Sequence, residues 1–299
     1  MFTRYRQRYP WLDHLVRAGQ AYLTNHGDHY AAAITYFSVL SLVPLLMVAF
    51  AVVAFVLAGN PQLLNELKGE IGSAVPALAD TLNPVIDEAI QSRSSVGILG
   101  LLLALYSGLG WMGNLRDALT AQWGSAHSEQ AESFLRTKLL DLLRLGGLGL
   151  ALIVSFALTG AGTAFAGFLL NLVGLADVGW ARAVFRLITL ALSLAGMWLV
   201  FLWVLARLPR EPVTLRSAMR AAVLGAIGFE VLKQVFASYL GSLSGSPTGQ
   251  LFGPIVGLMV FAFFVSRFLL FITAWAATAP ENRDANSGSS LMRDGAPTV

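Results

Sequence analysis

Long apolar stretches separated by short polar segments dominate the chain. A helix that crosses a bilayer needs about 20 consecutive apolar residues, because the hydrocarbon core is about 30 Å thick. Six stretches are of this kind, and they cover residues 30–58, 95–112, 139–170, 183–206, 215–240 and 251–277. The pattern predicts an all-α fold in which residues 30–278 form a polytopic membrane bundle of six transmembrane helices.

Three of these stretches have features that bear on the helices they predict. The third is too long for one perpendicular crossing, which predicts either a tilt or a break near residues 159–162. Pro44 in the first stretch is expected to kink the helix and to free a backbone carbonyl near Leu40. The fifth stretch is the least hydrophobic and carries charges. The predicted number of spans would change by one if this stretch did not cross the membrane.

The long connection at residues 59–94 is amphipathic. Its apolar residues recur at helical spacing with acidic residues between them, and Pro61, Pro76 and Pro84 lie where helices begin or break. The connection therefore predicts two or three short amphipathic helices that lie over the outer face of the membrane.

Basic residues gather at alternate ends of the predicted spans. The N-terminal segment, the second loop with its borders and the fourth loop contain Arg4, Arg6, Arg8, Arg17, Arg116, Arg136, Lys138, Arg144, Arg207, Arg210, Arg216 and Arg220. The other loops have few basic residues or none. Because basic loops remain in the cytoplasm, both termini are predicted to be cytoplasmic. Residues 1–29 are then a basic cytoplasmic segment, and residues 279–299 a disordered cytoplasmic tail.

Composition supports a membrane location and narrows the chemistry. Only 12% of the 299 residues are charged and 56% are hydrophobic, whereas soluble proteins carry about 25% charged residues. The absence of cysteine excludes disulfides and thiolate metal sites. The net charge of +3 is spread over short loops and not gathered on one face. This distribution suits membrane orientation, so nucleic acid is not an expected partner.

Ionisable residues within the apolar stretches are the best candidates for a functional site, since a charge at the centre of a membrane helix costs at least about 2.5–3.5 kcal/mol. Glu230 and Lys233 share a face of the fifth span. Arg182 and Arg186 lie at the outer start of the fourth span, and Arg267 lies in the inner half of the sixth. These residues suggest a polar cavity between the last three spans that binds an anionic headgroup. Alternatively, Glu230 and Lys233 neutralise each other, and the two arginines of the fourth span extend to the headgroups.

Polar residues near Pro44 are weaker candidates. Tyr36 and Ser41 could line the same cavity beside the kinked helix, although such residues more often pack helices together. Gly225 and Gly228 are best explained as small residues at a close helix contact.

Signatures of enzymes and cofactors are missing from the sequence. His26, Asp28 and His29 form a cluster just before the first span. The two histidines have a spacing that can bind a metal, but no third or fourth ligand is evident nearby, so the cluster is expected to mark the start of a helix at the membrane surface. There is no phosphate-binding loop, nucleophile elbow or H-E-x-x-H motif. Most acidic residues lie in the predicted outer loop, on the side away from RNA. The sequence therefore predicts neither an enzyme nor a cofactor.

Four motifs together resemble a known family. They are DHYAAAITYFSVLSLVP from Asp28 to Pro44; Leu105-Tyr106-Ser107 followed by Asn114 and Trp123; Leu208-Pro209-Arg210 leading into Gly225 to Lys233 with Phe236 and Tyr239; and Phe252-Gly253-Pro254-Ile255. Over roughly residues 20–280 the chain resembles the YihY/BrkB family of bacterial inner-membrane proteins, in particular its YhjD-like branch. The chain differs from the commoner pattern at Phe252, where Tyr is usual, and at Arg267, in a region that is often aromatic.

The resemblance implies six spans in the inner membrane. Some family members are linked to virulence, the YhjD-like branch to export of lipopolysaccharide precursors or lipids, and the family carries an old label as a ribonuclease that processes tRNA.

The favoured function is transport or flipping of a lipid or another amphipathic anionic substrate, with energy from a gradient or a partner because no ATPase motif is present. The alternatives are a scaffold for envelope assembly, without transport, and the ribonuclease of the old label. Predicted partners are membrane lipids, envelope-assembly proteins and further copies of the chain.

Overall fold

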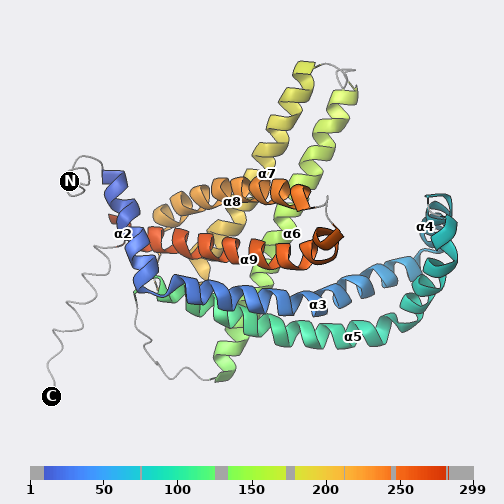
Figure 1. Ribbon diagram of the computed structural model, residues 1–299, viewed down its shortest axis with the longest axis horizontal. Helices are drawn as coiled ribbons and strands as arrows, with labels where there is room; N and C mark the ends of the chain where they lie inside the picture. The colour runs from blue at the N-terminus through green and yellow to red at the C-terminus, as the bar shows by residue number, and fades with distance from the viewer. Residues whose placement is uncertain are drawn as a thin grey trace. The chain divides into compact units, whose positions relative to one another are not determined.

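The structure is a computed structural model that describes residues 10–74, 76–124, 134–172, 179–211, 213–243, 247–280 and 282. Every regular element in these ranges is a helix (Figure 1). The helices are α2 (Pro10–Thr24), α3 (Gly27–Gly59), α4 (Pro61–Ala74), α5 (Pro76–Ala121), α6 (Phe134–Leu172), α7 (Gly179–Arg207), α8 (Leu215–Leu243) and α9 (Pro247–Ala277).

Six of these helices are long and apolar enough to cross a membrane. The candidate spans are Gly27–Gly59, Ile90–Ala121, Arg136–Phe165, Ala183–Arg207, Leu215–Tyr239 and Val256–Ala277. At most 28% of the most apolar window of any of them is buried inside the protein. Side chains such as Phe156, which is 74% exposed, therefore face outward, as lipid-facing residues do. The predicted all-α fold with six spans is confirmed.

Two details of the predicted helices differ from the structure. Of the short helices expected after the first span, only α4 is separate, because the rest of the connection belongs to the 46-residue helix α5. Pro84 lies inside α5, since a proline removes only one helical hydrogen bond and the turns around it remain intact. Helix α6 is also continuous through residues 159–162, so no break occurs there.

Contacts divide the chain into two units. The smaller unit is Tyr36–Trp111, and the larger combines Met1–Thr35 with Met112–Val299. In the smaller unit, α3 and α5 approach closely where Gly100 faces Met47, and the Trp111 indole donates a 2.7 Å hydrogen bond to the Ser38 hydroxyl. Pro44 lies inside α3 in this unit, and the kink expected there remains a prediction.

In the larger unit, α6, α7, α8 and α9 pack in sequence order and α2 packs on α9 (Figure 1). The core between α7, α8 and α9 combines large and very small side chains: Phe201, Leu205, Ala221, Ala222, Ile272 and Ala276. Small residues matter here because lipid is as apolar as the helices, so close packing rather than water exclusion holds membrane helices together.

Glycines provide the closest helix contacts. A Cβ atom on Gly225 would lie 2.5 Å from the Phe201 ring, and one on Gly228 would lie 2.2 Å from the Phe268 ring. The predicted packing role of both glycines is confirmed. In the contact of α6 with α7, a Cβ atom on Gly147 would lie 2.4 Å from the Trp203 indole.

A buried ion pair joins α5 to α6. Arg116 donates to the carboxylate of Asp141, and their side chains are only 5% and 1% exposed. Arg144 lies 3.5 Å from the same carboxylate oxygen, and Asp117 lies 3.2 Å from the Arg116 guanidinium. The sequence pattern had indicated only an orienting role for Arg116 and Arg144, whereas the structure shows that they belong to this network.

We expect Asp141→Asn to destabilise the protein by about 3–5 kcal/mol, because it removes the buried counter-charge of Arg116 and leaves only the more exposed carboxylate of Asp117 beside it. The free energy of unfolding in detergent measures the effect. The matched control is Arg144→Gln, which removes a more exposed and more distant charge and should cost at most about 1 kcal/mol. Equal losses in the two variants would contradict the importance of the buried pair.

We also expect Gly147→Ala to destabilise the protein by about 1–3 kcal/mol through overpacking against Trp203. Gly149→Ala is the control, because nothing lies within 4 Å of a Cβ atom at that position. This second substitution should stabilise the helix by up to about 1 kcal/mol. Thermal unfolding in detergent compares the two variants, and a harmless Gly147→Ala would show that α6 and α7 are not in close contact.

Candidate functional site

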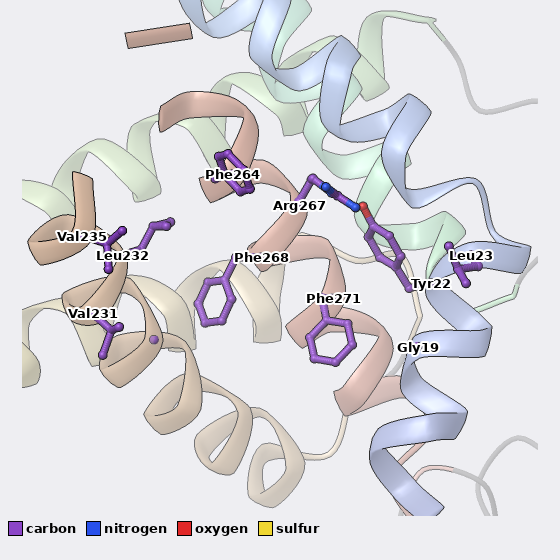
Figure 2. Close-up of a pocket in the computed structure, with 11 residues that line it drawn as sticks. Gly19, Tyr22, Leu23, Val231, Leu232, Val235, Phe264, Arg267, Phe268 and Phe271 are labelled. Carbon is purple, nitrogen blue, oxygen red and sulfur yellow. The ribbon is translucent and has the colours of Figure 1, made fainter. Parts of the chain in front are cut away.

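A cavity of about 550 Å³ opens in the larger unit between α2, α8 and α9 (Figure 2). Ligand pockets in proteins commonly measure about 300–1,000 Å³. The residues that line it are Gly19, Tyr22 and Leu23 from α2, Gly228, Val231, Leu232 and Val235 from α8, and Phe264, Arg267, Phe268 and Phe271 from α9.

The walls of the cavity are apolar apart from one cationic side chain. Phe264, Phe268 and Phe271 lie on one face of α9, because residues three and four apart are neighbours on a helix surface. Arg267 lies on this face and is the one charged residue in the lining. The cavity can therefore hold an apolar group with an anionic group attached at one side.

Arg267 is paired within the protein. Its Nε atom lies 2.8 Å from the Asp28 carboxylate, and the two side chains are 41% and 49% exposed. The Tyr22 hydroxyl donates a 2.5 Å hydrogen bond to the same Asp28 oxygen. Figure 2 shows the Arg267 side chain directed toward Tyr22. The cation at the cavity thus has an internal carboxylate as counter-ion.

The hydroxyl of Tyr22 keeps its proton at neutral pH. Burial of the ring, followed by the hydrogen bond to Asp28, raises the pKa of Tyr22 to about 12. The ring also covers Gly27, where a Cβ atom would lie 2.2 Å from the Tyr22 ring. The turn between α2 and α3 therefore needs glycine at position 27 for the ring to lie as it does.

Contacts further along α2 hold this helix on α9. The His14 ring stacks on Trp275 with 4.7 Å between centroids, and His14 Nε2 lies 2.9 Å from the Trp275 carbonyl oxygen. Tyr22 meets Phe271 edge-on at 6.4 Å. These contacts place Tyr22 and Asp28 beside Arg267.

The residues predicted to share one cavity are separated in the structure. Glu230 and Lys233 form a 2.6 Å ion pair, and the Ser193 hydroxyl donates to Glu230 at 3.4 Å. Neither charged residue lines the cavity beside α8. Arg186 is exposed on α7, and the side chain of Arg182 lies outside the described residues.

The cavity that the structure describes lies between α2, α8 and α9, whereas the expected polar cavity lay between the last three spans. Glu230 and Lys233 are close enough on α8 to neutralise each other, and Arg267 finds its counter-ion beside α2. A binding role for Glu230, Lys233, Arg182 and Arg186 remains a prediction. Of the predicted charges, Arg267 is the one that the structure places in the cavity lining.

The two predicted residues near Pro44 belong to the smaller unit. Tyr36 is 62% exposed, and the Ser41 hydroxyl donates to the carbonyl oxygen of Phe37 in its own helix at 2.7 Å. The Ser41 hydroxyl is thus satisfied within its own helix, and a ligand role for either residue remains a prediction.

Tyr22 and Asp28 were not identified as site residues from the sequence. Asp28 had been assigned only to the beginning of a helix at the membrane surface. Their roles depend on contact between α2 and α9, which are separated by more than 200 residues. A single polar residue next to an apolar span gives no indication of such a distant partner.

Comparisons with known proteins agree with this membrane architecture. The chain is 42% identical to an uncharacterized protein of Dickeya dadantii (strain 3937) over 288 residues, which cover 94% of this chain and 88% of the relative. It is also 42% identical to the inner membrane protein YhjD of Escherichia coli (strain K12), over 93% of this chain and 84% of that protein.

A more distant relative is YfkH of Bacillus subtilis (strain 168), a ribonuclease-like protein by name. It is 25% identical to this chain over 84% of the chain and 89% of its own length. No solved structure matches the chain. The profile of the family described as Virulence factor BrkB matches residues 18–295. The chain is therefore an integral membrane protein and belongs to the BrkB family.

Proposed function

We propose that this protein binds an amphipathic anionic lipid in the cavity between α2, α8 and α9 and moves it across the cytoplasmic membrane. The observation that carries the proposal is an apolar cavity with a single cation, Arg267, whose counter-ion is a carboxylate of the same chain. An acyl chain fits the phenylalanine-lined wall, and burial of each methylene group contributes about 0.8 kcal/mol. The phosphate of a headgroup suits the guanidinium, which can donate two parallel hydrogen bonds.

Asp28 allows one anion to replace another beside Arg267. In the empty cavity its carboxylate neutralises Arg267, which would cost at least about 2.5–3.5 kcal/mol at the centre of a membrane helix. Both side chains are nearly half exposed, so a lipid headgroup can reach the pair. A headgroup phosphate can therefore replace the Asp28 carboxylate as the counter-ion of Arg267. The Tyr22 hydroxyl, which remains protonated, can donate to either anion.

The relatives and the basic loops support the cellular setting. The Escherichia coli relative is an inner membrane protein by name, and the alternating arginines favour cytoplasmic termini. Transport energy then comes from a gradient or a partner protein, since the sequence has no ATPase motif. A scaffold for envelope assembly would need the outer segment around α4 to bind proteins, and it would not need the lipid cavity.

Reconstitution into vesicles tests the lipid carrier directly. We expect wild-type protein to move fluorescent phosphatidylglycerol between leaflets, and Arg267→Gln to slow this movement at least about tenfold, because a tenfold loss corresponds to only about 1.4 kcal/mol of lost interaction. Quenching of the outer-leaflet label measures the rate.

Arg216→Gln is the matched control, because it removes an exposed arginine of α8 that does not line the cavity. Val235→Trp, which fills the cavity from a 61% exposed position, should slow movement without changing any charge. Normal rates in both the Arg267 and the Val235 variants, or no movement by the wild-type protein, would overturn the proposal.

A separate assay tests the ribonuclease alternative, because one relative is ribonuclease-like by name. We expect purified full-length protein in detergent to leave tRNA precursors intact, since its sequence lacks the clustered carboxylates that a metal-dependent nuclease needs. Gel electrophoresis of the RNA measures the result. Cleavage that persists through repeated purification, and that a point substitution in this chain abolishes, would contradict this expectation.

A further inference from the structure

A second cavity, of about 440 Å³, lies entirely within the smaller unit. It is enclosed by the C-terminal part of α3, by Leu67 of α4 and by the part of α5 from Ile86 to Val96. Apart from Ser92 and Arg93, the lining is aliphatic or aromatic. Like the first cavity, it combines apolar walls with one cationic side chain.

The hydrogen bonding of Arg93 is incomplete. Its Nη1 atom donates to the carbonyl oxygen of Ile90, and its guanidinium lies 5.4 Å from the centroid of the Phe55 ring. Its Nε atom is buried and has no hydrogen-bond partner among the described residues. A buried donor without an acceptor costs about 1–3 kcal/mol. The described residues therefore supply no acceptor for this donor.

The position of Arg93 indicates where that acceptor comes from. Arg93 lies in the first turn of the span Ile90–Ala121, and Leu57 of the cavity wall lies in the last turn of the span Gly27–Gly59. The ends of membrane spans lie at the level of the lipid headgroups, with acyl chains directly beside them. Phosphate oxygens and apolar chains thus meet at this cavity.

The nearby cation of α4 is already neutralised. Lys68, next to the wall residue Leu67, forms a 2.7 Å ion pair with Asp87 of α5. Arg93 has no carboxylate partner among the ion pairs of the described residues. Arg93 is therefore the one charged residue in the cavity lining, and its charge favours an anion.

We propose that this cavity holds a resident anionic phospholipid, with an acyl chain between α3, α4 and α5 and the headgroup phosphate on Arg93. The apolar walls require a chain, so free phosphate does not satisfy the site. Because all three helices line the cavity, the bound lipid completes their packing and holds α4 in place. This structural role is independent of lipid movement through the cavity that contains Arg267.

Native mass spectrometry of the full-length protein in detergent, titrated with phosphatidylglycerol or phosphatidylcholine, tests this assignment. All variants carry Arg267→Gln, so that the first cavity does not contribute. We expect this background to bind one phosphatidylglycerol at least about tenfold more tightly than phosphatidylcholine. Adding Arg93→Gln should remove that preference, whereas adding Lys68→Gln, the same change of charge on a residue that is already paired, should preserve it.

Adding Leu67→Trp gives a second test that leaves Arg93 in place. Leu67 is 37% exposed, so a larger side chain there fills the cavity without disturbing a tightly packed core. We expect this substitution to weaken phosphatidylglycerol binding at least about tenfold. It tests the lipid site even if the Arg93 variant does not stay folded. Unchanged binding in a folded Arg93→Gln or Leu67→Trp variant, or equal losses with Lys68→Gln, would overturn the assignment.

The two proposals fail separately. Normal lipid movement by both the Arg267 and the Val235 variants would disprove the carrier proposal and leave the resident-lipid proposal intact. Loss of the lipid preference on Arg267→Gln alone would show that the preference belongs to the first cavity, and would overturn the assignment to Arg93.

Discussion

The energetic penalty for an unpaired charge in a membrane governs the placement of polar residues in this protein. Several charges within or beside the apolar helices lie against partners of opposite sign, as in Arg116 with Asp141 and Glu230 with Lys233. The pairs differ in exposure. Arg116 and Asp141 are almost fully buried and fasten two helices, whereas Arg267 and Asp28 are nearly half exposed beside a cavity. The two pairs therefore differ in how readily another molecule can reach them.

Close packing is the second constraint, and it operates where charge is absent. The contacts of α6 with α7, α7 with α8 and α8 with α9 each include a glycine against a larger side chain, as at Gly147, Gly225 and Gly228. These contacts let the helices approach without a gain from excluding water. Gly228, where α8 meets the Phe268 ring of α9, is also part of the lining of the first cavity.

The sequence predicted the six spans because a bilayer imposes a simple length and polarity requirement on each helix. It also predicted that Gly225 and Gly228 pack closely and that Arg267 belongs with a cavity. It could not predict Asp28 as the partner of Arg267, because the pair spans more than 200 residues and forms only once α2 lies on α9. The pairing of Glu230 with Lys233 had been weighed as an alternative, and it depends only on local helical spacing.

The continuity of α5 through Pro84 has a similar explanation. Proline raises the energy of one turn, but the long part of α5 that follows Pro84 is helical throughout. The position of a proline is therefore a weaker predictor of a helix boundary in long helices than in short ones. The same reasoning applies to α3, which continues through Pro44.

The hydroxyl of Tyr22 limits how this protein can use a proton-motive force. A phenol that gives up its proton only near pH 12 carries the same charge on both sides of any physiological membrane. The hydrogen bond from Tyr22 of α2 to Asp28 therefore does not change through titration of the Tyr22 hydroxyl when the outer compartment is acidified. A carrier built on this site and driven by protons would have to admit them through another ionisable side chain.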